Sequence, residues 1–138
     1  MTLTTTLRIC FLPVRDQEEA LTFYRDLLGF EVRADAPFDQ FRWLTVGPPN
    51  QPDIEINLEN PSMGRSPEDA ATILGLVAKG SMTSMIFHVN DLDALFEKLR
   101  AAGTEVIQEP IDQPYGFRDC AFRDPSGNHL RFSEPKGA

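Results

Sequence analysis

"FLPVRDQEEALTFYRDLLGFEV" at residues 11–32 and "IFHVNDLDALFEKLRAAGTEV" at residues 86–106 share one plan. Each begins as an apolar strand, passes an Asp that can cap a helix, and continues with apolar residues at helical spacing. Each helix then ends at a glycine that precedes another strand-like run. The matched pairs are Val14 with Val89, Asp16 with Asp91, Ala20 with Ala94, Leu21 with Leu95 and Gly29 with Gly103. These pairs predict an internal duplication in which the first helix carries one inserted residue just after its cap.

The rest of the chain extends each repeat by two further strands. Helices are expected from Asp16 to Gly29, over 67–78 and from Asp91 to Gly103. Strands are expected at 7–14, 30–35, 41–47, 53–58, 83–89, 104–109, 117–123 and 129–133. The order is therefore β-α-β-β-β, twice.

This order predicts one α+β domain over 1–138. It comprises a first module at about 5–60, a linker with a short helix at 61–80, and a second module at about 81–135. A βαβββ module covers one sheet face with its helix and leaves the other bare. Two bare faces can curl around an open, barrel-like cleft, so side chains pointing away from the helices are expected to line it.

Composition narrows the class of protein. The net charge of −8 argues against nucleic acid as a partner, because phosphates demand a basic face. No apolar run approaches a membrane span, and the N-terminus lacks a signal-peptide pattern, so we expect a cytoplasmic protein without a membrane partner. Cys10 and Cys120 show no CxxC spacing and lie in apolar strand-like runs, which predicts buried thiols rather than a disulfide.

The two repeats, together with "YGFRDCAFRDPSGNHLRF" at 115–132, resemble the vicinal oxygen chelate (VOC) superfamily. This group includes glyoxalase I, extradiol dioxygenases, fosfomycin-resistance enzymes and bleomycin-resistance proteins. The resemblance covers nearly the whole chain. It implies the glyoxalase/bleomycin resistance/dihydroxybiphenyl dioxygenase fold, a divalent metal held by His, Gln or Glu side chains, and a homodimer.

Transferring the family's four metal-ligand positions to this sequence gives Ile9, Glu55, Ser84 and Arg131. Only Glu55 is a ligand that a divalent metal favours. Isoleucine offers no donor, a serine hydroxyl is a weak neutral ligand, and an arginine repels the cation. Because such sites usually need three or more protein ligands, we expect no metal site and no cofactor.

Several polar and aromatic residues are candidates for ligand contact. Glu55 and Arg131 are expected in the cleft as an electrostatic substitute for the metal. They either bind and orient an anionic ligand group or form a purely structural ion pair. Strand alternation places Ser84 and His88 on the cleft face, and Glu55 with His88 would be the catalytic pair of an enzyme.

Three more residues complete the candidate set. Trp43 either forms, with Phe41, an aromatic surface on which a planar ligand could stack, or packs in the core. Tyr115 and Arg118 belong to a loop and strand start that border the cavity in the resembled family.

Three functions follow from the resemblance and these residues. The first is a metal-free, small-molecule binding protein of the bleomycin-resistance kind. The second is an enzyme, either a glyoxalase-type lyase or isomerase or a dioxygenase-like protein, acting through atypical metal ligation or metal-independent acid–base catalysis. The third is a structural or regulatory module with a closed cleft.

Overall fold

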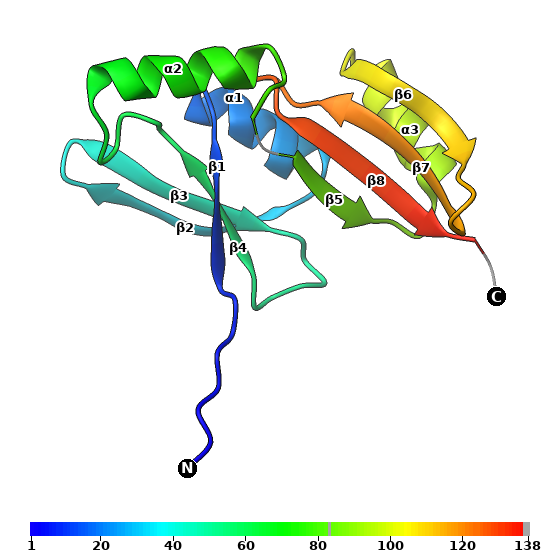
Figure 1. Ribbon diagram of the computed structural model, residues 1–138, viewed down its shortest axis with the longest axis horizontal. Coiled ribbons are helices and arrows are strands. Elements are labelled where there is room, and N and C mark those ends of the chain that lie inside the picture. The colour runs from blue at the N-terminus through cyan, green and yellow to red at the C-terminus, as the bar shows by residue number, and fades with distance from the viewer. Residues whose placement is uncertain (83, 137–138) are drawn as a thin grey trace. The chain divides into compact units, whose positions relative to one another are not determined.

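The computed structural model describes residues 1–82 and 84–136, with the backbone alone at Ser84. The chain divides into two units, Met1–Leu74 and Gly75–Ala138. The elements, labelled in Figure 1, are β1 (Ile9–Pro13), α1 (Gln17–Leu21), η1 (Thr22–Leu27), β2 (Glu31–Phe38), β3 (Phe41–Gly47), β4 (Glu55–Glu59), α2 (Pro67–Ala78), β5 (Ser84–His88), α3 (Leu92–Ala101), β6 (Glu105–Asp112), β7 (Phe117–Arg123) and β8 (His129–Pro135). Each predicted strand and helix is present.

Each unit contains one four-stranded mixed sheet. The strand orders are β1-β4-β3-β2 in the first unit and β5-β8-β7-β6 in the second. In both, the first strand pairs parallel with the last and the other pairs are antiparallel. The repeated βαβββ order and the α+β class are thus confirmed.

One face of each sheet carries the hydrophobic core beneath a helix. In the first unit this face presents buried Leu44, Val46, Ile56 and Leu58. In the second unit α3 covers the corresponding face, and the ring of Phe96 lies 5.4 Å from the ring of Phe122. Full burial of each such side chain stabilises the fold by about 1.5–3 kcal/mol. The opposite face of each sheet, turned away from its own helix, is called here the bare face.

The first helix is longer than its counterpart by one residue, and the structure places the extra residue away from the cap. Asp16 accepts a hydrogen bond from the backbone N–H of Glu19, as Asp91 does from that of Ala94. The two caps are therefore equivalent, which corrects the expected insertion point just after Asp16. The extra residue is absorbed later, in the π-helical turns of η1, because a π turn accommodates one more residue than an α turn.

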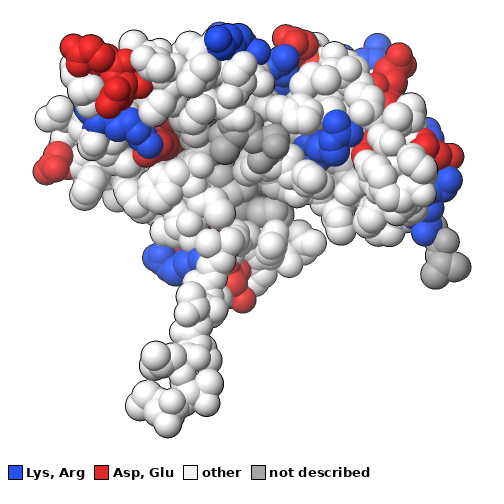
Figure 2. Space-filling model, in the orientation of Figure 1, with Lys and Arg blue, Asp and Glu red and all other residues white. Residues whose placement is uncertain are grey.

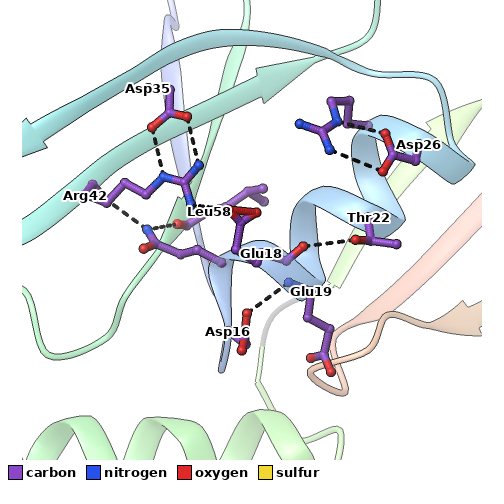
Figure 3. Close-up of polar contacts among 10 residues, drawn as sticks. Asp16, Glu18, Glu19, Thr22, Asp26, Asp35, Arg42 and Leu58 are labelled. Atoms are coloured by element: carbon purple, nitrogen blue, oxygen red, sulfur yellow. Dashed lines mark hydrogen bonds and ion pairs between the residues drawn. The ribbon is translucent and has the colours of Figure 1, made fainter.

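An arginine-centred ion-pair cluster fastens each helix to its sheet. Arg42 lies 2.8 Å from Asp35 and 3.3 Å from Glu18, at the start of α1 (Figure 3). Gln17 adds hydrogen bonds from its side chain to the backbone oxygens of Arg42 and Leu58. The pKa of Arg42 is raised, chiefly by the hydrogen bond to Asp35, although partial burial of the guanidinium acts in the opposite direction.

The second unit repeats this cluster with Arg118, which lies 2.9 Å from Asp93 and 3.3 Å from Asp112.

On the face in view in Figure 2, acidic and basic side chains lie beside one another. None of the described helices has the length and apolar character required to cross a membrane.

The "DPSGN" turn before β8 is held by Asp124. Its Oδ1 accepts hydrogen bonds from the backbone N–H groups of Ser126, Gly127 and Asn128. Gly127 has φ +113°, and a Cβ built there would lie 2.3 Å from the carbonyl oxygen of Val77 in α2. Only glycine fits this close approach, which fixes the turn from which β8 starts.

Candidate functional site

The bare face of the first unit is aromatic. Trp43 lies on it, with its ring centroid 5.9 Å from those of both Phe11 and Phe38. Strand alternation places Phe41 on the same face. Of the two alternatives for Trp43, the structure therefore selects the bare face over the core. Trp43 is half-buried there.

Glu55 is also on this face and is held within its own unit. The Thr45 hydroxyl donates a 2.6 Å hydrogen bond to Glu55 Oε1, and Arg8 Nη2 lies 3.8 Å from Oε2. Arg131 belongs to the other unit and has its own partners there. An ion pair between Glu55 and Arg131 stays a prediction.

The bare face of the second unit contains a hollow of about 200 Å³. Its lining consists of Ile86, His88, Tyr115, Phe117, Asp119, Arg131 and Ser133. Three of the predicted site residues, His88, Tyr115 and Arg131, are thus brought together. Ser84 begins β5 opposite His129, and its side chain lies outside the described part of the chain.

Asp119 is the centre of the polar contacts in this hollow, and its side chain is only 1% exposed. Its Oδ1 accepts hydrogen bonds of 2.8 Å from Gln108 Nε2 and 2.9 Å from Gln113 Nε2. Its Oδ2 accepts a 2.8 Å hydrogen bond from the Tyr115 hydroxyl and lies 3.3 Å from Arg131 Nη1. Burial alone would raise the pKa of Asp119, but these donors and the charge of Arg131 outweigh it and hold the pKa below its ordinary value.

Arg131 is anchored as well as paired. Its Nη1 donates a 3.0 Å hydrogen bond to Gln108 Oε1, and its side chain keeps 25% exposure. Because Asp119 balances its charge, the hollow presents little net charge to a ligand. The exposed remainder of the guanidinium can still donate hydrogen bonds or stack on a ring.

The titratable groups around Arg131 differ in their surroundings. The hydrogen bond to Asp119 raises the pKa of Tyr115, so its hydroxyl stays protonated as a donor. His88 is exposed, with its ring centroid 5.6 Å from that of Phe117. His129 is half-buried, and burial together with the charge of Arg131 lowers its pKa.

Two predicted placements do not hold. Arg118 takes part in the ion-pair cluster on the α3 side of the sheet, so the structure separates it from Tyr115 and the hollow. Cys10 is exposed near the start of edge strand β1, whereas Cys120 is buried as expected. Burial raises the pKa of the Cys120 thiol to about 12.

The strand registers decide which residues of the two repeats correspond. Asn57 pairs with Phe11 on β1, and Arg131 pairs with Ile86 on β5. The backbone N–H of Val14 bonds to the residue two after Asn57, just as that of Val89 bonds to the residue two after Arg131. The counterpart of Arg131 is therefore Asn57. The "IEI" triplet had predicted Glu55, which lies two residues earlier on the same face of β4.

The donors at these positions do not fit the divalent metal that the resemblance implies. One last-strand position holds a guanidinium bound to Asp119, and its counterpart holds the neutral amide of Asn57. Within residues 1–82 and 84–136, no three His, Cys, Asp or Glu side chains are grouped as a metal site would require.

Asp119 and Asn57 are among the residues that the sequence did not predict for these faces, as are Phe117 and Ser133 of the hollow. Asp119 could have been found from the sequence, because it is a carboxylate within the strand-like run "FRDCAF". It lies two residues before Ala121, on the same face of β7, and Ala121 pairs with Arg131 of β8. Asn57 had no such signal, since its position follows from the parallel register of β1 with β4.

Comparison with known proteins agrees with this fold. The Glyoxalase/Bleomycin resistance protein/Dioxygenase superfamily profile matches residues 6–132. The crystal structure of UcmS2 is 37% identical with a TM-score of 0.86, covering 95% of this chain and 98% of that one. TnmS3, an antibiotic binding protein from Streptomyces, is 29% identical with a TM-score of 0.76, covering 99% and 100%. A probable lactoylglutathione lyase from Synechocystis is 27% identical over 117 residues, covering 83% of each chain. The chain belongs to the glyoxalase/bleomycin resistance protein/dioxygenase superfamily.

Proposed function

We propose that this chain is a small-molecule binding protein that works without the metal site of its superfamily. Its ligand is a largely uncharged compound with a planar aromatic part. The observation that carries the proposal is the pairing of Arg131 with the buried carboxylate of Asp119, which puts a neutralised ion pair at a metal-ligand position.

The aromatic part of the ligand is inferred from the first unit. Trp43 and its two edge-on neighbours, Phe11 and Phe38, offer ring faces and edges on one sheet surface. Aromatic contacts of this kind add about 0.5–1.5 kcal/mol each beyond the burial of area.

The low charge of the ligand is inferred from the second unit. Ile86 and Phe117 make the wall of the hollow apolar, and Asp119 neutralises Arg131. A carboxylate ligand would have to compete with Asp119 for the guanidinium, whereas a neutral ring with a hydrogen-bond acceptor would not. This reverses the earlier expectation of an anionic ligand group at Arg131.

The relatives add support of a general kind. TnmS3 is named for antibiotic binding, and it matches this chain over nearly its full length. The particular ligand follows from none of these similarities.

The test uses the single tryptophan of the chain, Trp43, as the reporter. A panel of planar aromatic compounds is titrated against the purified protein, following tryptophan quenching and thermal shift. Saturable quenching with a rise in the unfolding midpoint is expected for neutral members. The absence of any saturable binding across the panel would sink the proposal.

A pair of arginine variants sharpens the test. Arg131→Met removes the guanidinium from the hollow, and Arg118→Met removes an equivalent guanidinium from the opposite face of the same sheet. We expect Arg131→Met to weaken binding of the compounds found, and Arg118→Met to leave it within about twofold. Equal affinities for both variants would remove Arg131 from the site.

The alternative is a lyase of the glyoxalase type, favoured by the Synechocystis relative and by His88 at the rim of the hollow. It predicts formation of lactoylglutathione from methylglyoxal and glutathione, or more than about half a mole of tightly bound metal per chain. Turnover that is lost in His88→Ala would establish the alternative.

A further inference from the structure

The first unit contains a buried asparagine side chain, Asn57, whose amide forms no hydrogen bond with the described residues. Asn57 is 1% exposed, and neither its Oδ1 nor its Nδ2 has a hydrogen-bond partner among the described residues. An unsatisfied buried amide costs a few kcal/mol in other proteins, and native folds rarely tolerate one without a reason. The side chain also lies in the middle of a sheet, where the backbone holds it firmly in place.

The position of Asn57 gives that reason. On the bare face it lies between Phe11 of β1 and Thr45 of β3, its two register partners. Trp43 is the next residue of β3 on this face, and its ring contacts that of Phe11. The unpartnered amide therefore adjoins the aromatic patch that the proposed function assigns to the ligand.

The alternatives to a ligand role are weak at this position. Thr45 does not satisfy the amide: its one hydroxyl hydrogen is donated to Glu55, and no hydrogen bond joins its oxygen to Asn57 Nδ2. Phe11 offers no hydrogen-bonding side-chain atom, and its side chain is 47% exposed. An exposed ring of this kind changes rotamer within nanoseconds, so it can cover Asn57 in the free protein and move aside for a ligand.

We infer that Asn57 is a specificity-determining residue that binds a neighbouring hydrogen-bond acceptor and donor on the ligand, of the kind that a carboxamide or lactam presents. The inference rests on the proposed function. An amide side chain carries one acceptor and two donors, so it pairs best with a group that offers both. Asn57 corresponds to Arg131 in the repeat, so each unit carries one polar side chain at this position of its own sheet.

The binding test compares two probes of nearly equal shape. 2-Naphthamide has an acceptor and a donor, whereas methyl 2-naphthoate has only acceptors. Wild-type protein is expected to prefer the amide by about tenfold, the size of a well-made hydrogen bond in a dry site. Asn57→Leu, which keeps the branched outline of the side chain and removes its polar atoms, is expected to abolish the preference. A preference that survives in Asn57→Leu would overturn the inference.

A stability test separates a ligand role from a structural one. If the amide has no partner, Asn57→Leu leaves the unfolding midpoint of the free protein unchanged or raises it by up to about 3 °C. Asn128→Leu is the matched control, because Asn128 is also 1% exposed but donates a 3.0 Å hydrogen bond to Asp124 Oδ2. We expect this control to lower the midpoint by several degrees.

The outcomes distinguish the two proposals. A fall in midpoint for Asn57→Leu as large as that for Asn128→Leu shows a structural amide and overturns the inference alone. Binding of both naphthalene probes with no preference in wild-type protein does the same. If no aromatic compound binds wild-type protein at all, the proposed function fails and takes this inference with it.

Discussion

Replacing Asp119 with Asn tests the arrangement of the second unit most directly. The substitution keeps the shape of the side chain and removes its charge. Oδ1 accepts from Gln108 and Gln113, while Oδ2 faces the Tyr115 hydroxyl and Arg131. If the new NH₂ group faces Gln108 and Gln113, it meets two donors and both contacts are lost. If it faces Tyr115 and Arg131, the tyrosine hydroxyl can turn to accept but the guanidinium cannot, and in either case Arg131 loses its counter-ion.

The expected cost follows from burial. Removing one partner of a buried ion pair costs about 3–5 kcal/mol, and each hydrogen bond to a charged group is worth about 1.5–3 kcal/mol. Arg131 keeps a quarter of its side chain exposed, so water recovers part of the solvation of its charge. We therefore expect Asp119→Asn to lower the free energy of unfolding by about 2–4 kcal/mol.

Urea denaturation followed by far-ultraviolet circular dichroism measures this loss. Asp112→Asn is the control, since Asp112 is exposed and pairs with Arg118 and Lys136 on the other side of the same unit. Such exposed pairs contribute at most about 1 kcal/mol. If Asp119→Asn costs no more than this control, the central role of Asp119 is wrong.

The pH dependence supplies a second check with a definite sign. The pKa of Asp119 is lower in the folded protein than in the unfolded chain. Its stabilising effect is therefore complete above the unfolded carboxyl pKa of about 3.9 and is lost as the pH falls through the folded value. The gap in unfolding free energy between wild type and Asp119→Asn should be constant near neutral pH and narrow in acid. A gap that widens in acid would contradict this assignment.

Three further outcomes are expected. Gly127→Ala should lower the free energy of unfolding by about 2–4 kcal/mol, because the new Cβ would collide with the carbonyl oxygen of Val77. Gly103→Ala is the control: open space surrounds it, so it should cost only about 1–2 kcal/mol. Equal losses in the two variants would show that the collision has no effect. Ellman's reagent should modify Cys10 and leave Cys120 unmodified in the folded protein, so two reactive thiols without denaturant would refute the burial of Cys120. Elemental analysis after purification should find well under half a mole of divalent metal per chain, and a stoichiometric amount would reopen the metal site.

Local patterns were enough to predict the elements of this fold. Caps, glycines and alternating apolar residues act within a few positions of the chain, so each helix and strand could be located before its neighbours were known. The one misplaced detail within a helix was the inserted residue. Its position depends on where the helix packs most easily as a π turn, and the cap motif carries no information on that.

The candidate site was harder to predict because it depends on strand register. Alternation placed His88 and Arg131 on one face correctly. It could not distinguish Glu55 from Asn57, since both have the same parity on β4. It also could not place Arg118, whose face depends on which side of the sheet α3 covers. Asp119 was within reach, because a carboxylate in a buried strand requires a partner such as Arg131.

The duplication itself separates what the fold needs from what the site needs. On the helix side the repeats keep the same chemistry: Arg42 and Arg118 each join an Asp of the neighbouring strand to an acid of the helix. On the bare faces the registers align residues that share almost nothing, namely Trp43 with Asp119, Thr45 with Ala121, Glu55 with His129, and Asn57 with Arg131. A metal site built from equivalent ligands of two repeats needs those bare faces to stay alike. The aromatic face of the first unit and the polar hollow of the second unit present different chemistry, each on its own sheet. The bare faces have diverged whereas the helix-side ion pairs have not, which is the pattern expected where the fold is kept and a duplicated set of metal ligands is not.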